Sequence, residues 1–422
     1  MRSGFYEALV REGRLIPHDE AEVPPSAPGA YKILRPAVIP FVSYPYEWCF
    51  SQLKDAALLT LEIQKIALAH GMSLKDGSAY NIQFVDGRPI FVDTLSFERL
   101  REGEPWVAYR QFCQHFLAPL ALMSRRDVRL SQMLRVHMDG VPLDLAHELL
   151  PWGTYFRPSL LFHVHLHAGA QRRYRSSAGN HNGNRKRMSR TALLGLIDSL
   201  EGALRSLHWK ARGTEWASYY EDTNYSPQAL EHKKILVSEF LTAVRPAGVW
   251  DLGGNVGVFS RLASNQQIPT ICMDADPAAV EMNYQDCVAR GEKHMLPLVQ
   301  DFTNPSAGIG WANEERLPLE ARGPADAALA LALVHHLAIG NNVPLPRIAD
   351  MLRRLCCHLL IEFVPKHDSQ VQRLLRSRQD VFTDYHQSAF EKEFAECFTI
   401  TGAEKIRGSE RTVYRMQRRL AA

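Results

Sequence analysis

Short apolar runs alternate with amphipathic stretches through the second half of the chain. The runs that predict strands lie at 249–252, 268–274, 296–302, 326–334 and 358–364. The stretches between them predict helices at 256–265, 277–290 and 345–355. Strands that alternate with helices predict a parallel, doubly wound α/β sheet. Two further runs, 398–406 and 412–417, follow without a helix between them and predict an antiparallel hairpin that closes the sheet.

A glycine-rich turn follows the first of these strands. Gly253, Gly254 and Gly257 come directly after Asp251 in the pattern D-x-G-x-G-x-G, with Asn255 at the middle glycine position. Asn is the residue after glycine that best tolerates the left-handed region, so this exchange is mild. No Lys-Ser/Thr follows the glycines, which argues against a phosphate-binding P-loop, and the spacing departs from G-x-G-x-x-G.

Acidic residues end the next two strands. Asp274 follows the second strand about twenty residues after the glycines, the offset at which an acid binds ribose hydroxyls in nucleotide-binding α/β folds, and Asp276 is the second choice. Asp301 ends the third strand. The fourth strand is apolar throughout, as expected for a strand buried on both faces, and is followed by His335 and His336.

The segment 231–422 resembles the class I S-adenosylmethionine-dependent methyltransferases, which have a Rossmann-like sheet with a C-terminal antiparallel hairpin. Within that class the sequence resembles the nodulation-type, host-specificity methyltransferase-like proteins. The matching segments are 216–220, 225–226 and Lys233 before the glycine turn, and 361–366 and 380–385 after the fifth strand.

This resemblance implies S-adenosylmethionine as the cofactor and assigns its contacts. Asp251 would orient the methionine amino group, the loop 253–257 would approach the cofactor through its backbone, and Asp274 would bind the ribose. Asp301 would lie at the adenine, with Phe302 packed on the ring.

The acceptor side of the site is predicted from position and chemistry. An oxygen nucleophile must lose a proton, and His335 and His336 stand where ligands of open α/β sheets bind, so one of them is expected to act as the base. Glu362 is a weaker candidate. Aromatic residues of a covering lid and a rim segment complete the predicted acceptor site: Trp216, Tyr219, Tyr225, Asp384 and Tyr385.

The first half predicts a mostly helical α+β domain over 1–167. A helix is expected from Glu47 to His70, and an Asp-Gly turn joins predicted strands at 82–85 and 89–92. Asp76, Asn81 and Asp93 resemble the catalytic loop and metal-binding acid of kinase-fold proteins. No glycine-rich loop precedes them, so we favour a truncated kinase-like lobe, with an unrelated helical domain as the alternative and an active kinase least favoured.

Between the halves, 168–190 is basic and rich in Gly, Ser and Asn, which predicts a flexible linker, and 191–230 predicts a helical and aromatic lid. The arginines of the linker could bind RNA, an anionic glycan or lipid head groups, or simply be solvated. His163, His165 and His167 alternate and would share one face of a strand; we interpret them as a polar edge and expect no metal.

Length and composition predict a globular protein with at least two domains. The chain has 422 residues, too many for one core, with 46% hydrophobic and 23% charged residues and a formal charge of +3. Its seven scattered cysteines predict reduced thiols of a cytoplasmic protein, and no run predicts a transmembrane segment or a signal peptide. The first interpretation of function is a methyltransferase that acts on a hydroxyl of a small molecule, sugar or glycan. The alternatives are an RNA methyltransferase that uses 168–190 and a non-catalytic, kinase-like scaffold that binds the cofactor. The sequence does not determine the acceptor, the acceptor atom or the oligomeric state.

Overall fold

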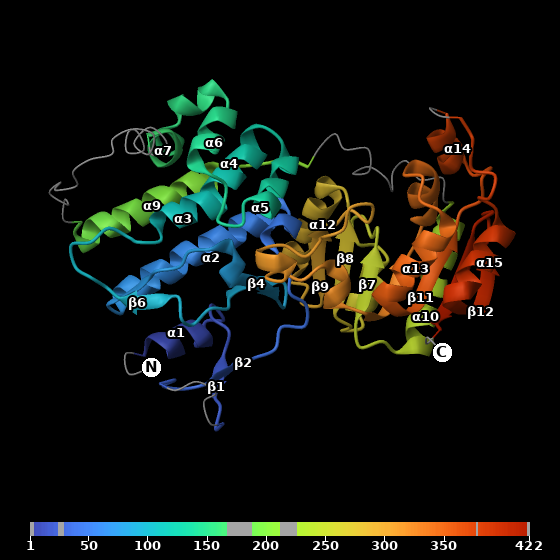
Figure 1. Ribbon diagram of the computed structural model, residues 1–422, viewed down its shortest axis with the longest axis horizontal. Helices are drawn as coiled ribbons and strands as arrows, with labels where there is room; N and C mark the ends of the chain where they lie inside the picture. Colours follow the sequence, from blue (N-terminus) through green and yellow to red (C-terminus); the bar gives the residue numbers. More distant parts are fainter. Residues whose placement is uncertain (1–3, 24–28, 167–187, 212–225, 377–378, 420–422) are drawn as a thin grey trace. The chain divides into compact units, whose positions relative to one another are not determined.

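The computed structural model describes residues 4–23, 29–166, 188–211, 226–376 and 379–419. The chain divides into two compact units, Met1–Lys210 and Ala211–Ala422, shown in Figure 1. None of the helices in the described ranges is both long enough and apolar enough to span a bilayer.

The first unit is built around one long buried helix, α2 (Phe50–Ala69), which ends where Gly71 takes a φ of 70°. Helix α9 (Arg190–Ser206) packs along it, and Lys65 of α2 binds Asp198 and Glu201 of α9 at 2.7 and 2.6 Å. The segment 191–206, expected as part of a lid, therefore belongs to the first unit.

Small strand pairs and short helices complete the first unit. The strands are β1 (His18–Glu20), β2 (Leu34–Pro36), β3 (Met72–Leu74), β4 (Ile82–Val85), β5 (Arg88–Phe91) and β6 (Phe97–Arg99). Hairpin β4–β5 turns through Asp86 and Gly87, both at positive φ, as the Asp-Gly pair predicts. The short helices are α1 (Phe5–Arg11), η1 (Pro45–Glu47), η2 (Ala79–Asn81), α3 (Tyr109–Phe112), η3 (Cys113–Leu117), α4 (Ala118–Arg125), η4 (Val128–Gln132), α5 (Met133–Val136), α6 (Leu143–Leu149), η5 (Trp152–Phe156), α7 (Pro158–Leu160) and η6 (Leu161–Leu166).

The second unit contains a seven-stranded sheet with the order β12–β13–β11–β10–β7–β8–β9. Its strands are β7 (Val249–Leu252), β8 (Thr270–Asp274), β9 (Met295–Val299), β10 (Ala325–Ala330), β11 (Cys356–Phe363), β12 (Phe398–Lys405) and β13 (Thr412–Arg418). Strands β7 to β11 run parallel, whereas β13 runs antiparallel to β11 and to β12. The predicted parallel sheet with a C-terminal antiparallel hairpin is confirmed.

Helices flank this sheet. They are α10 (Pro227–Val244), α11 (Ser260–Ser264), α12 (Pro277–Arg290), α13 (Leu345–Leu355), α14 (Ser369–Leu375) and α15 (Gln387–Cys397), with short turns η7 (Trp311–Asn313), η8 (Leu319–Arg322) and η9 (His336–Gly340). Helices α12 and α13 have the predicted bounds. Helix α12 contacts β8 and β9, and α10 and α13 contact β11 (Figure 1).

Strand periodicity explains which side chains meet α10. Val249, Leu360 and Val413 belong to one buried cluster with Leu236 and Phe240 of α10. Side chains two positions away on a strand point to the same face. Asp251, Glu362 and Arg411 therefore continue this α10-facing layer at the edge where the parallel strands end.

Three predicted elements need correction. The helix expected at 256–265 begins only at Ser260, because Asn255 and Gly257 have positive φ and hold the preceding residues in turns. The strand expected at 326–334 ends at Ala330, because Ala332 has a φ of 53° although the sequence remains apolar. His163 and His165 lie on the π-helix η6 instead of a strand, so alternation there does not place them on one strand face.

Candidate active site

The glycine-rich turn packs closely on β8. Gly253, Asn255 and Gly257 have φ values of 80°, 50° and 79°, in the left-handed region. The amides of Gly253 and Gly254 donate hydrogen bonds to the Met273 carbonyl at 2.8 and 3.0 Å. A Cβ at Gly254 would lie 2.5 Å from Cys272 Sγ, so only glycine fits this position.

Asp274 joins this turn to the end of β8. Its Oδ2 accepts a hydrogen bond from the Asn255 amide at 2.8 Å, and its Oδ1 accepts one from the Asp276 amide at 2.8 Å. Burial raises the pKa of Asp274 to about 6, against the opposing effect of these amide donors. The glycine turn and the predicted ribose acid therefore form one site. Asp276 caps α12 through the Ala278 amide at 2.8 Å, which gives it a structural role.

Asp251 lies beneath the turn. It is almost completely buried, and its Oδ2 accepts a hydrogen bond from the Ser260 hydroxyl at 2.6 Å. Burial raises the pKa of Asp251 to about 6, whereas the bond from Ser260 lowers it. Arg261 follows and fixes the turn from the other side, because its guanidinium donates to the Val256 carbonyl at 2.6 Å and to Asn283 Oδ1 at 2.9 Å.

Asp301 and Phe302 follow β9 near Asp274. The Gln300 amide donates to the Asp274 carbonyl at 2.8 Å, which brings the two strand ends together. Asp301 is exposed and accepts hydrogen bonds from the amide and hydroxyl of Thr303 at 2.8 and 2.7 Å, and Phe302 is buried. Their assignment to the adenine stays a prediction.

The segment after β10 brings the histidines to the same edge of the sheet. A Cβ at Gly253 would lie 3.3 Å from Leu333 Cδ1, so this segment passes directly beside the glycine turn. The rings of His335 and His336 are 4.1 Å apart. His335 is 1% exposed, and neither of its ring nitrogens has a hydrogen-bond partner in the part of the chain that the structure describes.

Both histidines are held neutral at pH 7. Burial, followed by the charges of His336, Arg411 and Lys233, places the pKa of His335 well below its ordinary value. Burial and the charge of Arg411 lower the pKa of the half-buried His336 to about 4. A neutral imidazole can accept a proton, although a pKa this far below neutral pH makes it a weaker base than an ordinary histidine.

A chain of buried charges lies next to these histidines. Lys233 Nζ contacts Glu362 Oε2 at 2.6 Å, and Arg411 contacts Glu362 at 3.5 Å and Asp368 at 2.8 Å. Burial lowers the pKa of Lys233, and the charge of Glu362 opposes this shift. Glu362 is fully buried and pairs with both cations, and its role toward an acceptor stays a prediction.

The predicted acceptor rim is only partly present. Tyr385 is buried, stacks on Phe363 with ring centroids 5.2 Å apart and donates its hydroxyl to the Val364 carbonyl at 2.8 Å, so it supports β11 instead of lining a rim. Asp384 is exposed and stays a candidate. Trp216, Tyr219 and Tyr225 lie outside the described residues.

The kinase-like residues of the first unit do come together. Asn81 Nδ2 donates to Ser96 Oγ at 3.2 Å, and Ser96 Oγ donates to Asp93 Oδ2 at 2.5 Å. The Asp76 carboxylate accepts hydrogen bonds from the Ser78 amide and from Gln111. Both carboxylates are thus engaged within the fold, and no group of three or more acidic, His or Cys side chains in the described ranges is arranged to hold a metal ion.

Several residues of the site escaped sequence reasoning. The sequence patterns do not indicate Ser260, Leu333, Asp368 or Arg411 as site residues, and the family resemblance includes Lys233 without giving it a role. Arg411 stands just before β13 and two positions before the buried Val413, but Arg415 and Gln417 continue the same face of the strand, so the alternation does not mark Arg411. The pairing of Lys233 with Glu362 joins residues 129 positions apart, and no local pattern encodes it.

The sheet order and the site together define the class of protein. Five parallel strands with the switch between β7 and β10, followed by an antiparallel hairpin inserted at β11, form the sheet of class I methyltransferases. The glycine turn and Asp274 stand at that switch, where ligands of open α/β sheets bind. The second unit is a class I S-adenosylmethionine-dependent methyltransferase domain.

The chain belongs to the family of the nodulation protein NoeA. It is 35% identical to NoeA of Rhizobium meliloti (strain 1021) over 419 residues, which cover 97% of this chain and 87% of the relative. No protein-family profile matches the chain.

Solved structures show more distant likenesses. The bifunctional kinase-methyltransferase WbdD is 14% identical with a TM-score of 0.33 and covers 47% of this chain and 41% of its own. Magnesium protoporphyrin IX methyltransferase of Synechocystis PCC 6803 with bound SAM is 16% identical over 48% of this chain and 89% of its own, with a TM-score of 0.33. The N-methyltransferase NodS of Bradyrhizobium japonicum WM9 with S-adenosylhomocysteine is 11% identical over 49% and 93%, with a TM-score of 0.34. Because all three scores are below 0.5, the assignment rests on the strand order, the site and the full-length relative.

Proposed function

We propose that the chain transfers a methyl group from S-adenosylmethionine to a hydroxyl of a small molecule, sugar or glycan. The observation that carries this proposal is the pair of sites at one sheet edge. Asp274 and the glycine turn lie together and could bind the nucleoside of the cofactor. His335 lies on the segment that passes beside that turn, and its neutral ring has no hydrogen-bond partner among the described residues.

The residues fit the cofactor. Gly254 leaves no room for a side chain between the turn and β8, so the backbone itself can form the wall of the site. Asp274 is partly exposed and receives only backbone hydrogen bonds, which leaves acceptor capacity for ribose hydroxyls. We assign the methionine amino group to Asp251 and the adenine to Asp301 and Phe302 as part of this proposal.

The chemistry required of the chain is alignment and proton removal. When bound, S-adenosylmethionine supplies an electrophilic methyl carbon on a positively charged sulfur. The protein aligns the acceptor oxygen for in-line attack and excludes water. His335 or His336 takes the proton that the hydroxyl releases, and a positioned base of this kind contributes about 10²–10⁴-fold to a rate.

Two experiments test this function. Calorimetric titration of the full chain with S-adenosylhomocysteine tests the cofactor, and transfer of a radiolabelled methyl group to hydroxylated acceptors tests the reaction. His335→Ala and His336→Ala are compared with His358→Ala. This control changes a histidine near the start of β11, away from the edge where the parallel strands end.

The expected result separates binding from chemistry. At least one of the two site variants loses turnover by about 10²-fold or more while it still binds the cofactor, and His358→Ala retains both. Absence of cofactor binding in the wild type contradicts the proposal as a whole. Unchanged turnover in both site variants contradicts only the assignment of the base.

The RNA and scaffold alternatives have less support. The RNA alternative depends on 168–190, of which the structure describes only Met188, Ser189 and Arg190. The scaffold alternative depends on a first unit whose kinase-like carboxylates are engaged internally, and it gives no reason for a neutral, buried His335 beside the cofactor turn.

A further inference from the structure

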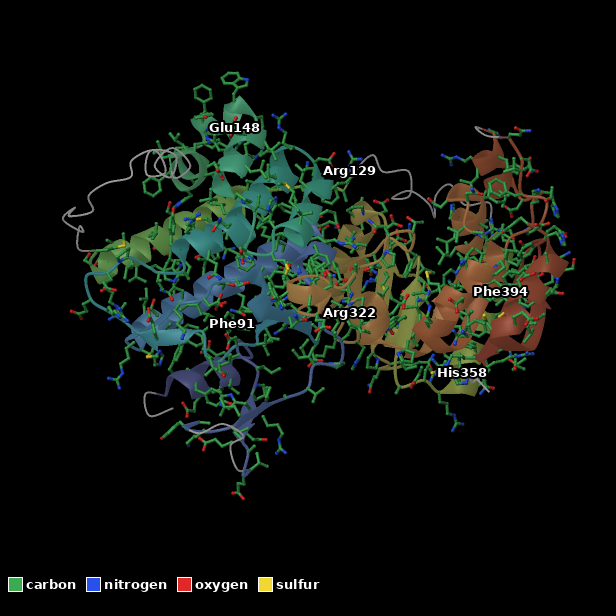
Figure 2. All side chains as sticks on the ribbon, viewed as in Figure 1. Phe91, Arg129, Glu148, Arg322, His358 and Phe394 are labelled. Carbon is green, nitrogen blue, oxygen red and sulfur yellow. The ribbon has the colours of Figure 1, made fainter. Side chains whose placement is uncertain are left out.

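The first unit exposes a cluster of large apolar side chains, the aromatic patch, on the short helices η5 and η6. Its members and their exposed fractions are Trp152 (75%), Tyr155 (43%), Phe156 (75%), Phe162 (54%) and Leu166 (57%). Trp152 and Phe156 contact each other edge to face with ring centroids 5.5 Å apart. In Figure 2, ring-bearing side chains stand clear of the ribbon beside the labelled Glu148. Large apolar side chains that are exposed together on two neighbouring short helices are typical of an interaction site.

The aromatic patch is held on a hydrogen-bonded base. The Tyr155 ring stacks on His165 at 4.1 Å, with the two rings only 9° from parallel. His165 is buried and hydrogen-bonds Thr154 Oγ1 at 2.8 Å and His147 Nδ1 at 2.9 Å. These contacts join η5 to η6 and hold the two helices that carry the exposed rings.

Arginines without counterions border the aromatic patch. Arg126 and Arg157 are exposed, and the charge of Arg157 acts on the half-buried Arg125. Arg126 Nε donates to the Leu149 carbonyl just before η5. The ion pairs between described residues include none of these three arginines, whereas the neighbouring Arg129 pairs with Asp127. The sequence that follows the patch, 168–190, adds six arginines and one lysine without an acidic residue.

We propose that the aromatic patch, together with Arg126 and Arg157, docks this protein on an anionic lipid surface. Aromatic rings favour the boundary between head groups and acyl chains, and neighbouring guanidinium groups pair with lipid phosphates. A protein partner would explain the apolar rings, and RNA would explain the arginines. A negatively charged bilayer explains both features in one surface.

Vesicle sedimentation of the full chain tests the proposal. The wild type is expected to bind vesicles of phosphatidylcholine with about 30% phosphatidylglycerol and to bind pure phosphatidylcholine much more weakly, with the difference shrinking at high salt. Trp152→Ala/Phe156→Ala is expected to weaken binding by about tenfold or more. Arg126→Gln/Arg157→Gln is expected to lose about fivefold per charge on anionic vesicles only.

Two variants control for indirect effects. Trp311→Ala removes a tryptophan that is 85% exposed in the second unit and should leave vesicle binding unchanged. Trp152→Phe should retain binding but lose the quenching of tryptophan fluorescence that brominated lipids cause. Each variant is compared with the wild type in thermal melting, so a folding defect is recognised.

Three outcomes overturn the proposal. The first is that the wild type does not bind anionic vesicles, or that Trp152→Ala/Phe156→Ala binds them as well as the wild type. The second is a concentration-dependent dimer that this double variant abolishes, which would assign the patch to a second copy. The third is RNA binding that the arginine changes abolish while vesicle binding persists in them, which would assign the arginines to nucleic acid.

Discussion

At the residue scale, burial of two carboxylates sets the pH range in which the candidate site changes its charge. Asp251 and Asp274 both have a pKa raised to about 6, with burial as the largest cause. In the proposed function Asp274 accepts hydrogen bonds from both ribose hydroxyls, and only the ionised carboxylate leaves both oxygens free to act as acceptors. Cofactor binding is therefore expected to depend on pH in a range where ordinary aspartates no longer titrate.

The first prediction concerns this dependence. The affinity for S-adenosylhomocysteine should be constant from about pH 8 to 6.5 and fall below about pH 6, by up to about tenfold per pH unit, as the carboxylates become protonated. Asp274→Asn should bind about tenfold or more weakly at pH 7.5, because a charge-assisted pair is lost. Calorimetric titration measures both effects, and Asp198→Asn in the first unit is the control.

Protein stability should not follow the same curve. The pKa of Asp274 in the folded state lies above the value of an unfolded chain, so this residue stabilises the fold as the pH falls from about 6 toward about 4. Thermal melting of the free protein can thus separate loss of binding from unfolding. An affinity that stays constant down to pH 5 would contradict the assignment of Asp274 to the ribose.

At the scale of elements, the glycine turn works because three elements hold it. Strand β8 accepts its amides through Met273, α11 provides Arg261 to the Val256 carbonyl, and α12 holds that guanidinium through Asn283. The turn is thus preorganised before a ligand binds. This arrangement makes the turn sensitive to any added atom.

The second prediction tests that sensitivity. Gly254→Ala places a Cβ 2.5 Å from Cys272 Sγ and should weaken S-adenosylhomocysteine binding by about tenfold or more, because the turn must shift. Cys272→Ala in the same chain should restore part of the affinity. Gly248→Ala is the control, because the nearest atom to its added Cβ is 3.7 Å away. Equal affinity in Gly254→Ala and the wild type would show that the turn does not contact the cofactor.

The third prediction concerns the buried charges between α10, β11 and β13. Lys233→Met should lower the free energy of unfolding by about 3–5 kcal/mol, because Glu362 loses its 2.6 Å partner while it stays buried. Lys233→Met/Glu362→Gln should recover part of this loss. Urea unfolding measures the effect, and Lys234→Met, at the half-buried neighbouring position, should change stability by no more than about 0.5 kcal/mol. A small effect in Lys233→Met would mean that the ion pair is replaced by water.

At the scale of the whole molecule, the residues that the proposed function assigns to the cofactor and to proton removal belong to one unit. Asp251, Asp274, Asp301 and His335 lie within Ala211–Ala422, and the internal packing of that unit forms the site. The first unit has its own core around α2 and carries the aromatic patch. Cofactor chemistry and surface docking are thereby placed in separate units of the same chain.

The fourth prediction follows from this division. A fragment of residues 211–422 should fold cooperatively and bind S-adenosylhomocysteine within about threefold of the full chain, since its compact unit contains every assigned cofactor residue. Calorimetry of fragment and full chain gives the comparison. A fragment that folds but no longer binds would show that the first unit contributes to the cofactor site.

The sequence by itself determined the sheet and the residues near its switch point. Apolar runs, helix periodicity and the acid at each strand end are local signals, and they predicted α12 and α13 with their observed bounds and the meeting of Asp274 with the glycine turn. Residues such as Ala332 carry no such signal, because its positive φ, which ends β10, is imposed by its surroundings.

Only the tertiary structure decided what the buried polar side chains do. Glu362, on β11, and Tyr385, in the segment after β11, are predicted acceptor residues because of their place near the expected site. In the structure Glu362 pairs with Lys233 and Arg411, and Tyr385 donates its hydroxyl to the Val364 carbonyl. Their partners are distant in sequence, and a buried charge or hydroxyl must find a partner wherever the fold provides one. Local pattern predicted the order of the strands and the acids that follow β8 and β9, but not the end of β10. The long-range requirement to satisfy buried groups decided which side chains are left for a ligand.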